Sequence, residues 1–315
     1  MTTKVTKRYL LNQSALYHCT SKRKLARVLQ IDLKRLVGIV GDIPNQYSTI
    51  TRPKKDSGER IVHNAHFELK RVQRRLFTLL RRVKRPNWLI SGEIGKSITD
   101  NVRPHLGGTQ LLKIDISGFF DNCSRESVYQ FFHVQMAQPS DVAKICTDLC
   151  TLENAVVQGA STSMLIAFYA NQSMLQELHE LAEDNSLIFT VYVDDIAFSS
   201  SHSFQASDIL DQATRIVSAY GFRVKNKKVR AYNDSRPKLL TGVIITTTSK
   251  MAVPNCKRRK ILDDMTQYRR STNPAERRSM RSKILGQISA AQQIEPDFFT
   301  GVKNQLKYEM RMDED

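Results

Sequence analysis

Hydrophobic residues recur along this chain with two different spacings. Where they fall three and four positions apart they predict amphipathic helices, over residues 25–40, 68–83, 127–132, 142–150, 164–182, 206–220, 257–268, 274–291 and 296–310. Shorter apolar runs bounded by turn residues predict strands, over 47–50, 60–63, 111–116, 187–193, 196–199, 222–224, 239–247 and 251–253. This mixture predicts an α+β fold, and the change to helices alone near residue 250 predicts a separate helical subdomain.

Two adjacent carboxylates stand between two of the predicted strands. Asp194 and Asp195 separate the apolar run that ends at Val193 from the one that begins at Ile196, so they occupy the tip of a predicted hairpin. Like charges side by side at an apolar turn repel each other unless a cation neutralises them, and carboxylate oxygens suit a hard divalent metal. Two interpretations stay open at this point: an ordinary Asp-Asp turn and a metal site.

A third acid, Asp115, ends the predicted strand 111–116. Together with the hairpin pair it supplies the ingredients of a two-metal site, in which bridged divalent cations activate an attacking hydroxyl and neutralise a triphosphate. The spacing alone does not say that the two strands are neighbours.

The charge balance narrows the function classes. The 315 residues include 48 Lys and Arg against 31 Asp and Glu, a net charge of +17, and such an excess favours a polyanionic partner. We favour nucleic acid and expect no membrane partner, because we find no lipidation motif, polybasic tail or membrane-spanning apolar run. Six cations on the outer face of the predicted helix 68–83 are expected to contact nucleic acid: Lys70, Arg71, Arg74, Arg75, Arg81 and Arg82.

Composition is typical of a folded chain, with 41% hydrophobic and 25% charged residues. Five cysteines, an odd number without a Cys-x-x-Cys pair, favour neither a disulfide framework nor a zinc knuckle. Because we also see no signal peptide, we expect a cytoplasmic protein.

Five short motifs follow one another along the chain: Lys113–Phe120, Val157–Ser163, Tyr192–Asp195, Gly221–Lys228 and Leu240–Gly242. In this order they resemble the successive palm motifs of reverse transcriptases. They look like the first metal-binding aspartate, the Gln-Gly turn, the Tyr-x-Asp-Asp box, the lysine-bearing motif and the strand that follows it. Five motifs in order, with sensible spacing, argue against coincidence.

Two elements are similar to those of the bacterial retron class of reverse transcriptases. Asn101–His105 is similar to that class's Asn-Ala-x-x-His element, with Val102 in place of alanine, and Leu240–Gly242 resembles its Val-Thr-Gly element. Val193 stands where many retron enzymes carry alanine, and the proline common at or near position 161 is missing. These departures leave the fine substrate preference open.

The resemblance implies a right-hand polymerase architecture. Fingers would comprise residues 1–105 with part of 121–157, a palm of antiparallel sheet plus helices would comprise 106–250, and a helical, RNA-binding thumb would comprise 251–315. Its cofactor would be Mg²⁺ in a two-metal mechanism, with these metal ligands: Asp115, Asp194, Asp195 and the backbone carbonyl of Ile116.

Further roles are implied position by position. Lys228 matches a lysine that protonates the leaving pyrophosphate, beside the catalytic residues Asp115, Asp194 and Asp195. Phe120 would exclude a 2′-hydroxyl and so select deoxynucleotides. The other dNTP-binding residues would be Gln158, Gly159, Lys55 and Arg60, with Arg52 or Lys54 as alternatives in the fingers. The residues implied to recognise RNA are Asn101, His105, Thr241 and Gly242.

The implied function is synthesis of a branched RNA–DNA product, called msDNA, from a cognate structured non-coding RNA. The partners would be that RNA, its DNA product and dNTPs, with a retron effector protein of antiphage defence as a candidate. Another bacterial reverse transcriptase stays open, of group II intron, diversity-generating or phage-exclusion type. So does a non-catalytic RNA-binding scaffold, although three acids in so basic a protein argue against it.

Overall fold

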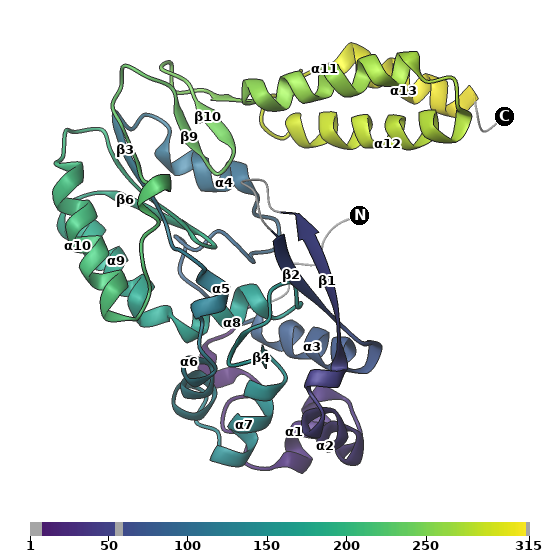
Figure 1. Ribbon diagram of the computed structural model, residues 1–315. Helices are drawn as coiled ribbons and strands as arrows, with labels where there is room; N and C mark the ends of the chain where they lie inside the picture. The colour runs from purple at the N-terminus through teal and green to yellow at the C-terminus, as the bar shows by residue number, and fades with distance from the viewer. Residues whose placement is uncertain (1–7, 54–58, 313–315) are drawn as a thin grey trace.

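The computed structural model describes residues 8–53 and 59–312. Helices gather around the N-terminal part, a four-stranded sheet lies in the middle, and a three-helix bundle stands apart at the C-terminal end (Figure 1). The mixture of helices with antiparallel sheets confirms the predicted α+β class.

The N-terminal part contains helices α1 (Lys22–Leu29), α2 (Leu33–Gly41) and α3 (Phe67–Leu80), with the hairpin of β1 (Tyr47–Pro53) and β2 (Glu59–Ala65) between α2 and α3. The prediction of one helix over 25–40 is wrong. Gln30 adopts the left-handed conformation (φ 57°) and ends α1, and the Asp32 carboxylate accepts from two backbone N–H groups to begin α2.

The basic face of α3 is only partly available to a partner. Arg75 donates to the carbonyl of Val28 (3.0 Å), and Arg81 and Arg82 lie half-buried over the rings of Phe77 and Tyr9. A nucleic-acid contact there stays a prediction, carried mainly by the other three cations of the face.

The central sheet has the strand order β6 (Ile188–Tyr192), β7 (Asp195–Ser200), β3 (Gln110–Asp115) and β8 (Arg230–Tyr232), with neighbouring strands antiparallel. The predicted strand 222–224 is wrong, because only Val224 forms a bridge, to Ile116. Strand β8 was not predicted from the sequence, because it has only three residues and lies at a largely exposed edge of the sheet.

Alternate residues of the sheet enter different environments. Leu112, Ile114, Ile196 and Phe198 are buried in the main core, which α9 (Gln172–Asp184) and α10 (Ala206–Ala219) cover side by side (Figure 1). On the opposite face, Leu111 and Ala197 belong to a second core. That face carries polar groups nearer the end of the strands.

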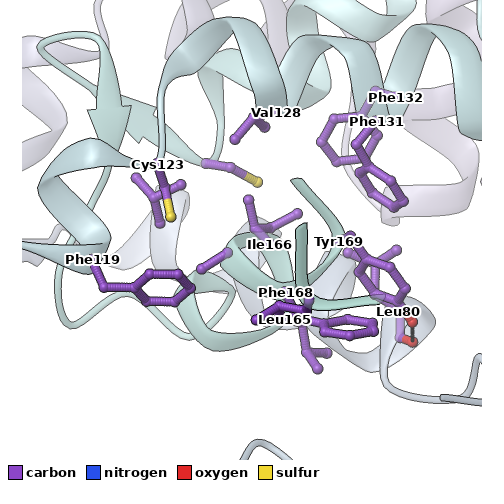
Figure 2. Close-up of a cluster of buried hydrophobic side chains, with 14 of the residues drawn as sticks. Leu80, Phe119, Cys123, Val128, Phe131, Phe132, Leu165, Ile166, Phe168 and Tyr169 are labelled. Carbon is purple, nitrogen blue, oxygen red and sulfur yellow. Dashed lines mark hydrogen bonds between the residues drawn. The ribbon is translucent and has the colours of Figure 1, made fainter. Parts of the chain in front are cut away.

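The predicted long helix 164–182 is broken at Asn171 into α8 (Ser163–Ala170) and α9. The Asn171 amide donates to the carbonyl of Ala167 and to the sulfur of Cys123, which anchors the break. Figure 2 shows α8 in the main core, where Tyr169 stacks on Phe131 at 4.8 Å between ring centroids. Phe131 begins a π-helical turn that follows α6 (Arg125–Gln130).

A second hairpin replaces the single strand predicted over 239–247. Thr241 and Gly242 have φ values of 47° and 76°, so the chain reverses there between β9 (Lys238–Leu240) and β10 (Val243–Ile245). The strand predicted over 251–253 corresponds to β11 (Met251–Ala252), which pairs with β10. The bundle that follows consists of α11 (Asn255–Arg270), α12 (Pro274–Ala291) and α13 (Thr300–Met312).

Five shorter elements complete the fold: α4 (Ile98–Val102), α5 (Phe119–Asn122), α7 (Ser140–Asp148), β4 (Thr151–Leu152) and β5 (Ala155–Val156).

Candidate active site

Three acidic residues meet at one end of the central sheet. Asp115 is paired with Asp195 in the β3–β7 ladder, and the backbone N–H of Ile116 donates to the carbonyl of Asp194 (3.0 Å). The turn residues Val193 and Asp194 join β6 to β7. The fold thus supplies the adjacency that the sequence spacing alone could not establish.

The turn that presents Asp194 is held in an unfavourable backbone conformation. Val193 has φ 62°, a region that costs a β-branched residue roughly 1–2 kcal/mol. Its backbone N–H donates to the hydroxyl of Ser91 (3.0 Å), a side chain that sequence reasoning missed. Ser91 follows a segment bonded to β6 at Val191, so the turn is braced from the adjacent chain.

Two lysines neutralise two of the acids. The ammonium of Lys228 lies 2.8 Å from Oδ2 of Asp115, whose carboxylate is almost fully buried. The ammonium of Lys113 lies 3.0 Å from Oδ1 of Asp195. Sequence reasoning predicted a role for Lys228 but gave none to Lys113, although its place two residues before Asp115 puts both on one face of a strand.

Burial and neighbouring groups shift the pKa values of Asp194, Asp195 and Lys228. Burial and the nearby Asp115 carboxylate raise the pKa of Asp194. Burial also raises the pKa of Asp195, although the charge of Lys113 opposes this. The hydrogen bond to Asp115 raises the pKa of Lys228 and so keeps that ammonium charged.

A cleft of about 740 Å³ opens beside Asp194, the one acid of the three that lines it. Its lining includes Asp194, Lys228, Phe120, Gln158 and His63. The predicted residues Phe120 and Gln158 therefore share one cavity with two of the predicted catalytic groups.

Gly159 sits beside this cleft in a conformation that suits glycine. Its φ is 100°, and a Cβ there would lie 3.5 Å from the side chain of Val62 on β2. The β1–β2 hairpin therefore reaches the cleft. Arg60 lies on β2 opposite Arg52, but Lys55 and Lys54, like the side chains of Arg60 and Arg52, lie outside the described part of the chain.

The residues expected to contact RNA divide into two groups. Asn101 and His105 are 0% exposed, so in this conformation their side chains do not reach a partner's surface. Their role in RNA recognition stays a prediction, and it would be indirect. His105 bonds to the hydroxyls of Ser199 (2.6 Å) and Thr190 (2.8 Å), and burial lowers its pKa to about 4, so it is a neutral interior group. Asn101 donates to the hydroxyl of Thr241 (2.7 Å).

Thr241 and Gly242 remain partly exposed at the β9–β10 turn. The carbonyl of Gly242 accepts from Lys257 of α11 (2.8 Å). The two retron-like sequence elements therefore meet in space and join α4, the hairpin and the start of the bundle.

The oxygen donors at the sheet end suit a hard divalent cation such as Mg²⁺ in kind. In this conformation, however, no three acidic, histidine or cysteine side chains among the described residues are arranged to hold a metal ion. The ion pairs explain this, because the Lys228 ammonium is bonded to the Asp115 carboxylate and the Lys113 ammonium to the Asp195 carboxylate. A metal ion would compete with these lysines for the carboxylate oxygens.

Residues 52–267 match the reverse transcriptase (RNA-dependent DNA polymerase) family. The chain belongs to this family. As a reverse transcriptase it is similar to the retron Ec48 reverse transcriptase of Escherichia coli, with 27% identity over 231 residues, 69% of this chain and 56% of that protein. It is also similar to the retron Mx65 reverse transcriptase of Myxococcus xanthus, with 28% identity over 220 residues, 64% of this chain and 52% of that protein. The chain thus spans little more than half the length of these two curated relatives.

A solved structure shares the fold of this reverse transcriptase. The apo telomerase of Candida tropicalis aligns with a TM-score of 0.51 and 10% identity, covering 76% of this chain and 52% of the telomerase. At that identity the likeness concerns the fold alone. No helix among the described residues is both long enough and apolar enough to cross a bilayer.

Proposed function

We propose that this reverse transcriptase copies a cognate structured RNA into single-stranded DNA and leaves a branched RNA–DNA product, as a retron enzyme. The observation that carries the proposal is the meeting of Asp115, Asp194 and Asp195 at the end of the sheet, beside a cleft large enough for a nucleotide. Similarity to several retron reverse transcriptases supports the retron assignment.

The proposed architecture is a right hand. Residues 1–105 with part of 121–157 form fingers, residues 106–250 form the palm, and residues 251–315 form the thumb. In support, the β1–β2 hairpin borders the cleft and the α11–α13 bundle stands apart from the sheet (Figure 1). The bundle is rich in Lys and Arg, which suits contacts with the phosphates of a duplex.

Mg²⁺ would be held mainly by Asp115 and Asp194, with Asp195 beside them and the backbone carbonyl of Ile116 as a further oxygen ligand. When bound it would activate the attacking hydroxyl and neutralise the charge of the triphosphate. Lys228 would leave Asp115 and protonate the pyrophosphate, which its half-exposed position in the cleft permits.

Nucleotide selection is assigned to the walls of the cleft. Phe120 would pack against the sugar and exclude a 2′-hydroxyl, while Gln158 and Gly159 would line the base and sugar of the incoming dNTP. Lys55 and Arg60 would close over the triphosphate from the fingers.

Recognition of RNA is assigned to the exposed turn of Thr241 and Gly242 and to the thumb. Asn101 and His105 would act from the interior by holding this turn and the sheet. An effector protein of antiphage defence is a further proposed partner.

The proposal is tested by purifying the protein from its host with its nucleic acid attached and sizing that material on a denaturing gel after RNase or DNase treatment. A discrete DNA of fixed length whose mobility changes with RNase is expected. DNA of mixed lengths would point to another class of reverse transcriptase.

The matched control is Asp194→Asn, which keeps the side-chain shape and removes the charge. We expect it to abolish DNA synthesis while RNA binding persists. Substantial synthesis by a clean preparation of this variant would contradict the metal-site assignment, and absence of any nucleic acid from the wild-type preparation would contradict the function itself.

A further inference from the structure

Lys113 occupies a position that the sheet makes specific. It lies opposite Ala197 in the β3–β7 ladder, two residues along β3 from the Asp115–Asp195 pair and on the same face of the sheet. A long side chain can reach the diagonal neighbour on the next strand, and its ammonium lies 3.0 Å from Asp195 Oδ1. The small side chain of Ala197 leaves room for the lysine to cross.

The two lysines of the site differ in their freedom to move. Lys228 is the last residue of a short 3₁₀ turn (Asn226–Lys228), its side chain is 42% exposed, and it lines the cleft. Lys113 projects from β3, which has β7 and β8 on either side, and its side chain is only 17% exposed. Lys228 can therefore leave Asp115 for solvent far more readily than Lys113 can leave Asp195.

We infer that Lys113 is a positioning residue that keeps the Asp195 carboxylate on the sheet, so that Asp115 and Asp194 provide the working metal ligands. This inference rests on the proposed polymerase function and deepens it. Three uncompensated carboxylates would repel one another and could bind a cation in several arrangements. With Lys113 held on Asp195, the two remaining acids define one arrangement.

The test is a double-mutant cycle on the full chain, made of Lys113→Met, Asp195→Asn and the combination. Urea unfolding is measured without divalent metal and again in saturating MgCl₂. We expect a coupling of about fivefold in the unfolding equilibrium constant, unchanged by MgCl₂. Absence of coupling without metal would mean that Lys113 and Asp195 do not interact, and absence of coupling in MgCl₂ would mean that the metal displaces Lys113. Either result overturns the inference. The same cycle with Lys113→Gln serves where the apolar replacement prevents folding.

Two further measurements separate positioning from simple stability. Lys113→Met is expected to lower kcat about tenfold, because misplaced ligands cost rate. Lys113→Arg, and Asp195→Asn added to Lys113→Met, should each recover part of that loss.

Mn²⁺ titration followed by electron paramagnetic resonance should show tighter but altered binding in Lys113→Met, because a third carboxylate is released. Wild-type Mn²⁺ binding in that variant contradicts the inference.

The matched control is Lys144→Met, which removes a lysine paired with Asp148 at 2.8 Å on α7. It should leave kcat and Mn²⁺ binding unchanged, and an equal loss there would reduce the Lys113 effect to general destabilisation. Failure of the proposed function is a separate result, since it would appear as a wild-type protein that makes no DNA, whereas the metal-free cycle is readable in either case.

Discussion

Single residues at the sheet end hold a conformation that their own preferences oppose. Val193 keeps a left-handed backbone although it is β-branched, and the two acids that follow it are half-buried and close to a third carboxylate. Such local cost persists only when surrounding groups fix it. Ser91 on one side and the two lysines on the other supply that restraint.

Ser91→Ala tests the restraint on the turn. Removing the hydroxyl leaves the backbone N–H of Val193 without its acceptor, so we expect a loss of about 1–2 kcal/mol in the free energy of unfolding. The fall in kcat should exceed any change in KM, because the acid following Val193 loses its fixed place. Urea unfolding and primer extension measure both. Ser91→Thr should retain most activity, and Ser207→Ala, at an exposed position, is the control; equal behaviour of the two alanine variants would refute the role.

The carboxylates also predict how stability depends on pH without metal. The folded pKa values of Asp194 and Asp195 are raised, so the folded state holds these protons more tightly than the unfolded state. Their contribution to stability is present in full below the unfolded carboxyl pKa of about 3.9 and is lost as pH rises through the folded values. Asp194→Asn should therefore stabilise the metal-free protein at neutral pH, and the difference should shrink as pH falls. Urea unfolding midpoints of the wild type and Asp194→Asn are compared from low to neutral pH. A difference between them that does not change with pH would rule out the link between the raised pKa of Asp194 and stability.

At the scale of elements, the Asn101–Thr241 hydrogen bond connects α4 to the β9–β10 turn across the second core. Both Asn101 and the adjacent Val102 are buried, which makes this a structural joint between segments far apart in the sequence. The exposed part of the turn is then free to face a nucleic acid.

Asn101→Ala should lower the free energy of unfolding by about 0.5–1.5 kcal/mol, because it removes the hydrogen-bond partner of the half-buried Thr241 hydroxyl. RNA affinity of the folded fraction should change little. Thr241→Val probes the same bond from the other side, and the effects of the two variants on stability should be less than additive. Unchanged stability together with a large loss of RNA affinity in a filter-binding assay would restore the direct-contact interpretation.

Sequence periodicity predicted most elements but not the places where they break. The helix predicted over 25–40 and the one over 164–182 keep apolar spacing across Gln30 and Asn171, where a left-handed residue and a side-chain hydrogen bond interrupt the backbone. The single strand predicted over 239–247 is in fact a hairpin. Threonine rarely adopts a positive φ, so the sequence did not indicate a turn at Thr241. Of the site, the acids stand in recognisable motifs, whereas the contact of Ser91 with Val193 is tertiary and has no local signal. Lys113 shares a strand face with Asp115, but its partner Asp195 lies on another strand, so its ion pair could not be predicted from spacing.

For the whole molecule, the net charge of +17 and the basic α11–α13 bundle both favour binding of a polyanion. A polyanion bound across the sheet and the bundle would release counterions from many phosphates, so binding should weaken steeply with salt. The three helices of the bundle share a core with the β9–β10 hairpin, and this continuity gives the bundle a fixed base on the sheet side.

Replacing Arg269 and Arg270, exposed at the end of α11, by glutamine tests the bundle as an RNA surface. Each phosphate that an arginine no longer neutralises should reduce the slope of log affinity against log salt by roughly one unit, so affinity should fall most at low salt. Binding of a structured RNA is measured over a series of KCl concentrations. Lys34→Gln with Arg35→Gln removes the same charge from exposed positions on α2, at the far end of the molecule from the bundle (Figure 1). If both double variants lower the slope equally, net charge alone governs binding; only a larger effect at Arg269 and Arg270 assigns the RNA to the bundle.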